Sequence, residues 1–208
     1  MRRSYFVEGK RGGGLKILAL DSSGLVASVA LAEDDNLIAE YTVQYKKTHS
    51  QTLLPMLEEI VRMVEMDLST VDAIAVAAGP GSFTGLRIGS ATAKGLAFAL
   101  GKPIIPVPTV DGLAFQMYGA KDLVCPIMDA RRSQVYTGIY EFMPGQIGRF
   151  SYDMRVIREQ CAVAFDEIAE ALNGLDRSVI FMGDGVPVFR ERMEQVMRVP
   201  YTAAPLHR

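Results

Sequence analysis

Two acidic turns and two glycine turns carry the residue types best suited to chemistry in this sequence. One apolar run ends in Asp21 and turns through "SSG", and a later run ends in Asp129 and turns through "ARRS". The glycine turns are "GPGSFTG", which begins at Gly79, and "GDG", which begins at Gly183. A glycine turn between a strand and a helix start favours an anion, whereas a turn aspartate also bonds its own backbone. Both uses stay open at this point.

The usual signatures of an independent active site are incomplete. In "GPGSFTG", Thr84 stands where the third glycine of a dinucleotide fingerprint belongs, and no glycine precedes Lys and Ser/Thr as in a Walker loop. The chain has 2 histidines, His49 and His207, in neither of the spacings that zinc peptidases use. We therefore predict no catalytic residue, no metal site and no cofactor of the chain's own.

The hydrophobic pattern predicts one arrangement of elements written twice. After three apolar runs separated by turns come an amphipathic helix, the strand "VDAIAVAAG", a helix over 83–100, the strand "PIIPVP" and a helix from Thr109. From "VCPIMD" onward the same order returns, and "FDEIAEALN" and "SVIFMGDG" supply the second helix, strand and glycine turn. We therefore predict a flexible lead-in over 1–14, an N-terminal half over 15–118 and a C-terminal half over 119–208.

This duplicated order is the plan of the actin, sugar-kinase and Hsp70 group, an α/β fold of two ribonuclease H-like halves. In nucleotide-binding members of that group, the positions of Asp21 and Asp129 hold a magnesium ion or a water. The resemblance implies a vestigial nucleotide site here, at Asp21, Ser22, Asp129, Gly183 and Gly185. The second copy stops at "VPYTAAPLHR", whereas the first continues through a strand and a helix, so we expect the C-terminal half to be incomplete.

Four longer motifs resemble one family within that group. "LALDSS", "HSQTLLPMLEE", "AVAAGPGSFTGLRIGSATAKGLA" and "PIMDARRSQVYTGIYE" are similar to the TsaB (YeaZ) family, whose members help to form threonylcarbamoyladenosine in tRNA. The resemblance is strong over residues 15–143 and looser to Phe189. It implies a noncatalytic paralogue of TsaD, a protein also labelled a glycoprotease, with ATP and metal held by the partner subunits.

The same resemblance implies partners that the composition allows. They are TsaD in a heterodimer, TsaE with it, a second copy when TsaD is absent, and tRNA only indirectly through the complex. With 22 Lys and Arg against 24 Asp and Glu, the formal net charge is -2, which gives no basic surplus for direct binding to a polyanion. No run of 18 uncharged residues suits a membrane span, and we expect a cytoplasmic protein.

The predicted helix over 83–100 is apolar on two sides. At about 100° per residue, one arc holds the glycines and small residues, a second holds Phe98 and its neighbours, and a narrow polar strip separates them. One sheet covers only one arc, so the other faces either a neighbouring helix of this chain or another chain. Methionines on the preceding helix add adaptable contacts. The predicted partner interface is Met56, Met63, Gly85, Gly89 and Ala93.

Three functions remain open on these observations. The first is a noncatalytic subunit that binds TsaD in the tRNA-modifying assembly. The second is a stand-alone nucleotide-dependent enzyme or a glycoprotease of the M22 type, which the incomplete phosphate loop and the missing histidine pattern disfavour. The third is a homodimeric structural protein. We adopt the first as the working prediction.

Overall fold

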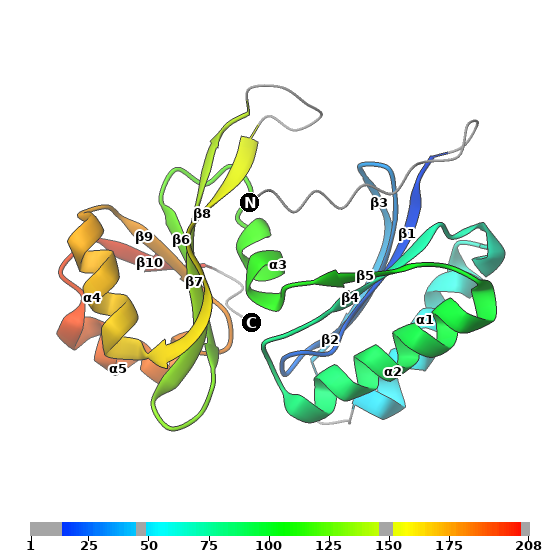
Figure 1. The fold of residues 1–208 in the computed structure, drawn as a ribbon, viewed down its shortest axis with the longest axis horizontal. Helices are drawn as coiled ribbons and strands as arrows, with labels where there is room; N and C mark the ends of the chain where they lie inside the picture. The colour runs from blue at the N-terminus through cyan, green and yellow to red at the C-terminus, as the bar shows by residue number, and fades with distance from the viewer. Residues whose placement is uncertain (1–13, 45–48, 146–151, 205–208) are drawn as a thin grey trace. The chain divides into compact units, whose positions relative to one another are not determined.

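The computed structural model describes residues 14–44, 49–145 and 152–204, and within the first helix it describes the side chains from Gln51 onward. Contacts divide the chain into two compact units, Met1–Pro108 and Thr109–Arg208. Each unit contains one five-stranded sheet with its own helices (Figure 1). No helix within the described ranges is both long enough and apolar enough to cross a membrane.

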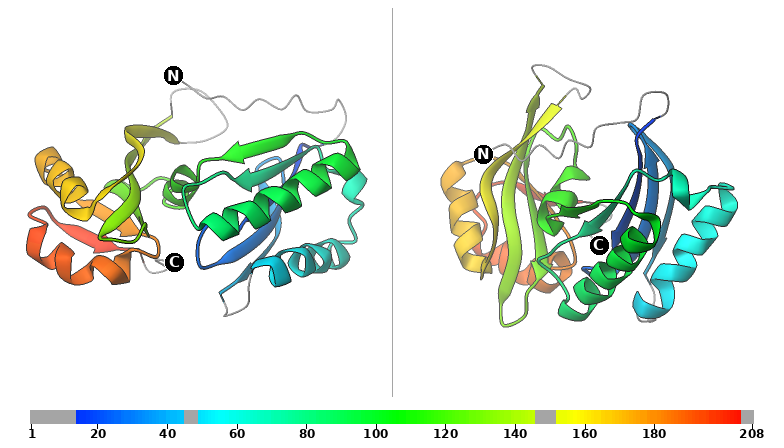
Figure 2. Two further views of the ribbon diagram at one scale, coloured as in Figure 1. Left: turned by 60° about the horizontal axis from the view of Figure 1, so that its bottom comes forward. Right: turned by 45° about the vertical axis from the view of Figure 1, so that its right-hand side comes forward.

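The first unit is a mixed sheet with two helices on one face. Its elements are β1 (Lys16–Asp21), β2 (Ala27–Glu33), β3 (Asn36–Val43), α1 (His49–Met63), the short 3-10 helix η1 (Leu68–Thr70), β4 (Ala73–Ala77), α2 (Phe83–Leu100) and β5 (Ile104–Val107). The strand order is β3-β2-β1-β4-β5, in which β1 is antiparallel to β2 and parallel to β4. Helices α1 and α2 lie side by side against the sheet (Figure 2).

Helix α2 has the boundaries that the sequence predicts because both ends are capped. The Ser82 hydroxyl accepts a hydrogen bond from the backbone N–H of Gly85, which satisfies one free donor of the first turn. At the other end Gly101 adopts a left-handed φ of 64° and its N–H donates to the carbonyl of Ala97. The helix therefore begins at Phe83 and ends at Leu100.

The second unit repeats the plan of the first. Its elements are α3 (Thr109–Phe115), β6 (Leu123–Asp129), β7 (Gln134–Pro144), β8 (Tyr152–Ala164), α4 (Phe165–Leu175), β9 (Val179–Met182), α5 (Val186–Val196) and β10 (Tyr201–Ala203). The strand order is β10-β9-β6-β7-β8, with β6 antiparallel to β7 and parallel to β9. Read from the opposite edge, as β8-β7-β6-β9-β10, it matches the first sheet's order strand for strand. The predicted fold class, two duplicated ribonuclease H-like halves, is therefore confirmed.

Two details differ from the sequence-based expectation. The units divide after Pro108 rather than after residue 118, because α3 packs on the second sheet, where the Tyr140 hydroxyl donates to Asp111 Oδ1 at 2.7 Å. The C-terminal half also has the strand that we expected to be missing. Strand β10 pairs in parallel with β9, as β5 pairs with β4.

Candidate functional site

The glycine arc of α2 lies against the chain's own sheet. Gly85, Gly89, Ala93 and Ala97 are the buried residues of this helix. A Cβ at Gly89 would lie only 2.6 Å from Ser22 Oγ and 3.6 Å from Val76 Cγ2. This arc is therefore closed by the β1–β2 turn and by β4.

Four of the five predicted interface residues are consequently not on the surface. Met56 is only 3% exposed and belongs to the core between α1 and the sheet. The sheet buries Gly85, Gly89 and Ala93, because small residues are needed where the helix backbone comes close to it. The expectation that these four are open to a partner is wrong, whereas Met63 is 68% exposed.

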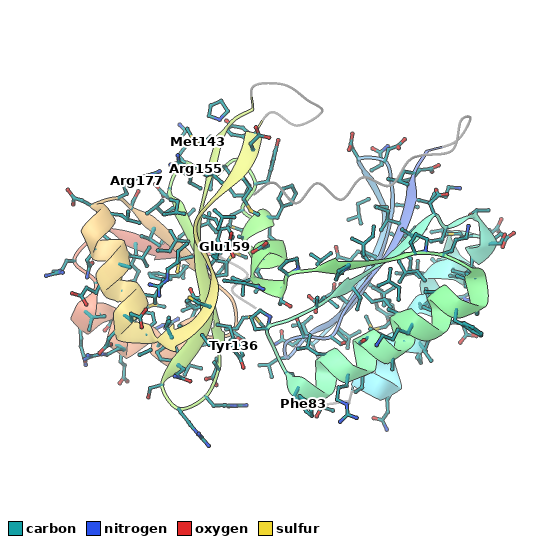
Figure 3. All side chains as sticks on the ribbon, in the orientation of Figure 1. Phe83, Tyr136, Met143, Arg155, Glu159 and Arg177 are labelled. Atoms are coloured by element: carbon teal, nitrogen blue, oxygen red, sulfur yellow. The ribbon has the colours of Figure 1, made fainter. Side chains whose placement is uncertain are left out.

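The opposite side of α2 is exposed and carries two phenylalanines beside Arg87 and Lys94. Phe98 is 92% exposed and Phe83 is 75% exposed, one near each end of the helix. Arg87 lies over the Phe83 ring, with its guanidinium carbon 5.3 Å from the ring centre, and Phe83 lies at the start of α2 (Figure 3). We call this surface, formed by Phe83, Arg87, Ala91, Lys94, Gly95 and Phe98, the α2 outer face.

The polar strip of α2 predicts the exposure of Phe83 but not which arc is buried. With Gly85 at 0° on a helical wheel, Phe83 falls at about 160°, inside the strip of Arg87 and Lys94 that must face water. An aromatic residue inside that strip is necessarily exposed with it. The strip borders both arcs, however, so it does not decide which of them faces the sheet.

In the first unit the acidic turn is engaged within its own half. Asp21 Oδ1 accepts hydrogen bonds from the backbone N–H of Ser23 at 2.7 Å and from its hydroxyl at 2.6 Å. The buried Ser22 hydroxyl donates to the carbonyl of Gly85 at 2.9 Å, and the N–H of Ser82 donates to the carbonyl of Ser23. These bonds fasten the glycine turn and the start of α2 to the β1–β2 turn.

The second acidic turn is fastened in a similar way. Asp129 accepts from the Arg131 backbone N–H at 2.8 Å, forms an ion pair with its guanidinium at 3.1 Å, and donates its own N–H to Asp184 Oδ1. Burial raises the pKa of the Asp184 carboxyl. A Cβ at Gly183 or Gly185 would lie 2.4 Å or 2.9 Å from the Ile127 carbonyl oxygen. Both glycines are thus required for close backbone packing.

These contacts show which predicted nucleotide-site residues meet. In the first unit Asp21 and Ser22 adjoin the glycine turn, and in the second Asp129 meets the turn of Gly183 and Gly185. All five have structural roles within their own unit, and their description as a vestigial nucleotide site stays a prediction.

The sequence also predicts that the chain has no metal site of its own. Among the residues that the structure describes, no group of three or more His, Cys, Asp or Glu side chains is placed to hold a metal ion. Of the two histidines considered above, the His49 side chain and all of His207 lie outside the described residues. The prediction of no metal site of the chain's own therefore stays a prediction.

Comparison with known proteins assigns the chain to a family. The family model described as TsaD: tRNA N6-adenosine threonylcarbamoyltransferase matches residues 36–201. The tRNA threonylcarbamoyladenosine biosynthesis protein TsaB of Bacillus subtilis is 36% identical over 183 residues, which are 88% of this chain and 77% of that protein. The chain belongs to the TsaB (YeaZ) family.

Other members of the family agree with this assignment. TsaB of Escherichia coli is 36% identical over 130 residues, which are 61% of this chain and 55% of that protein. The solved structure of YeaZ from Pseudomonas aeruginosa superposes with a TM-score of 0.71 and 31% identity, and the match covers 93% of this chain and 86% of that one. Another solved structure from that organism, described as similar to the peptidase YeaZ, gives a TM-score of 0.72 at 30% identity, covering 93% and 85% of the two chains.

Proposed function

We propose that this chain is a noncatalytic subunit that binds TsaD, and with it TsaE, in the assembly that forms threonylcarbamoyladenosine in tRNA. The α2 outer face is the observation that carries the proposal. Phe98 and Phe83 are exposed to 92% and 75% on one helix, and burying such side chains against a partner is strongly favourable. Aromatic side chains of this kind dominate the energetics of many protein interfaces.

The shape of this face favours a helix as the occupant. Ala91 and Gly95 are small, exposed residues between the two phenylalanines, and a Cβ at Gly95 would meet nothing within 4 Å. A second helix can therefore approach the α2 backbone closely between two aromatic anchors. The family resemblance names TsaD as that partner, and a second copy of this chain when TsaD is absent.

The acidic turns support a noncatalytic role. The Asp21 carboxylate is bonded to Ser23 and the Asp129 carboxylate to Arg131, so both act first as turn-forming groups. We expect the pure chain to show no enzymatic ATP hydrolysis and no proteolysis. Turnover that disappears in an Asp21→Ala variant with an unchanged melting temperature would instead favour a stand-alone nucleotide-dependent enzyme. For the glycoprotease alternative, protein cleavage by the pure chain would be the decisive observation.

Calorimetric titration with TsaD tests the interface. Phe98→Glu should weaken the complex at least about a hundredfold, because an unpaired carboxylate at a buried contact costs several kcal/mol and each 1.4 kcal/mol is tenfold in affinity. Met63→Glu tests whether the interface extends onto α1. The matched control is Leu175→Glu, since Leu175 is also an exposed apolar residue on a helix, at 38%, but belongs to the second unit.

The possible results separate the alternatives. Loss of TsaD binding in Phe98→Glu, with wild-type binding in Leu175→Glu and unchanged melts, supports the proposal. Wild-type affinity in Phe98→Glu removes the α2 outer face from the complex. If TsaD does not bind at all, while Phe98→Glu abolishes self-association in sedimentation velocity, the homodimeric structural protein becomes the better function.

A further inference from the structure

A hollow of about 680 Å³ lies on the second unit, whereas the α2 outer face belongs to the first. It lies between the β6–β7 turn and residues of α4 and α5. Its charged and polar lining is Asp129, Arg131, Arg132, Ser133, Asp166 and Arg192. Its apolar lining comes from Ala164, Phe165, Val188 and Phe189. Of these four side chains Val188 is the exposed large one, whereas both phenylalanines are buried.

The charges around the hollow are unbalanced. Arg131 forms an ion pair with Asp129 at 3.1 Å, and the Arg192 guanidinium binds Asp166 through two hydrogen bonds of 2.7 Å and 2.5 Å. Arg132 is exposed and forms no ion pair within the described ranges. The lining therefore offers one guanidinium beyond those that its own carboxylates neutralise.

The turn that presents Arg132 does so in a conformation that its residues disfavour. Arg131, Arg132 and Ser133 have φ values of 66°, 52° and 60°. Left-handed backbone is unfavourable for residues with a Cβ, and hairpin turns of this kind usually carry Asn or Gly. The corresponding turn of the first unit contains Gly24. The turn thus holds Arg132 in a backbone conformation that glycine adopts more easily.

We propose that this hollow binds an acidic segment of a partner protein in which a carboxylate stands beside an aliphatic side chain. Arg132 would pair with the carboxylate, and Val188 would contact the aliphatic group. A protein segment suits the lining better than an RNA backbone does, because the exposed Val188 beside Arg132 offers an apolar contact that an aliphatic side chain fills and a sugar-phosphate backbone does not. The proposal does not depend on TsaD binding, which involves the other unit.

A peptide with the sequence "AEDDNLIA", which copies residues 32–39 of this chain, is a suitable probe. It combines three acidic residues with Leu and Ile. Fluorescence anisotropy of the labelled peptide with the full chain should show saturable binding. Arg132→Glu should weaken that binding at least about tenfold, the effect of losing one good charge pair. The matched control is Arg190→Glu, an exposed α5 arginine outside the hollow, which should bind as the wild type does.

Two further arms make the outcome decisive. A peptide with Gln and Asn in place of the acidic residues should bind at least about tenfold more weakly than the probe, and Val188→Ser should weaken binding of the original probe. Equal binding of the probe by Arg132→Glu and wild type, with unchanged melts, would overturn the proposal. So would absence of binding, or preference for a single-stranded RNA oligonucleotide or pyrophosphate over the peptide at the same salt concentration.

Discussion

The two units share a sheet order, but the exposed surfaces of their helices differ in chemical character. In the first unit the α2 outer face exposes Phe83 and Phe98. In the second unit α4 and α5 are joined by the Asp166–Arg192 ion pair, and Glu167 of α4 pairs with Arg158 of β8. The duplicated plan fixes what faces each sheet, while the outward residues are free to diverge. The first unit thereby presents two exposed phenylalanines, whereas the second presents ion pairs.

The glycine turns show the same divergence inside the two units. Gly79 and Gly183 both have left-handed backbone, with φ values of 96° and 101°. A Cβ at Gly79 would lie 3.2 Å from the flexible Leu86 side chain, whereas a Cβ at Gly183 would lie 2.4 Å from the Ile127 backbone oxygen. Gly183 is therefore more tightly constrained than Gly79, whereas in the first turn it is Gly81 whose Cβ would lie 2.4 Å from a backbone oxygen, that of Ser23.

The largest predicted effect is the difference in stability loss between substitutions at these two glycines. Gly183→Ala should lower the free energy of unfolding by more than about 3 kcal/mol, since positive φ and a clash with backbone add together. Gly79→Ala should cost only about 1–2 kcal/mol, because Leu86 can move. Urea denaturation of the full chain measures both. Equal losses for the two variants would show that Gly79 and Gly183 are equally constrained despite their different neighbours.

The next effect comes from a buried carboxylate in the second unit that pairs with two partly exposed arginines. Glu141 is the buried carboxylate of the described core, and it binds Arg177 at 2.5 Å and also pairs with Arg155; Figure 3 labels both arginines. Glu141→Gln should cost about 1–2 kcal/mol near pH 7, a moderate value because both arginines are partly exposed. Denaturation of wild type and variant at pH 7 measures this difference.

The pH dependence of that difference has a defined sign. The hydrogen bond from Arg177 lowers the pKa of Glu141 from its ordinary value of 4.5. The carboxylate therefore stabilises the folded chain fully above pH 4.5, and this contribution is lost as the pH falls through the lower folded-state pKa. Wild type and Glu141→Gln should converge in stability in that acidic range. A difference that grows on acidification would contradict the assignment.

The smallest predicted effect tests the helix surfaces directly. Gly95 of α2 and Gly174 of α4 are both exposed, and a Cβ at either would meet nothing within 4 Å. Alanine at Gly95 should stabilise the free chain by about 0.5–1 kcal/mol, and at Gly174, near a helix end, by no more than that. Only Gly95→Ala should also weaken TsaD binding, by filling the place where a partner helix approaches. Thermal melts and calorimetry distinguish the two, and unchanged affinity in Gly95→Ala would exclude close approach there.

Much of this architecture follows from local sequence, and the exceptions have physical causes. Ser82 and Gly101 mark the ends of α2 because caps are local features. The buried arc could not be read in the same way, since both arcs are apolar and periodicity does not choose between them. The contact that decides it joins Gly89 to Ser22, far away in sequence. Likewise the pattern from Thr109 predicts a helix, but only its packing on the second sheet assigns α3 to that unit.

The contiguity of each sheet has a consequence for synthesis. Strands β1 to β5 all lie before Thr109, and β6 to β10 all follow it. A ribosome therefore delivers every strand of the first sheet before any strand of the second, so the first unit can fold while the chain is still growing. Early folding of the first unit would limit mispairing between the two similar sheets. The strands of the first sheet would already be hydrogen-bonded to one another when the strands of the second sheet emerge.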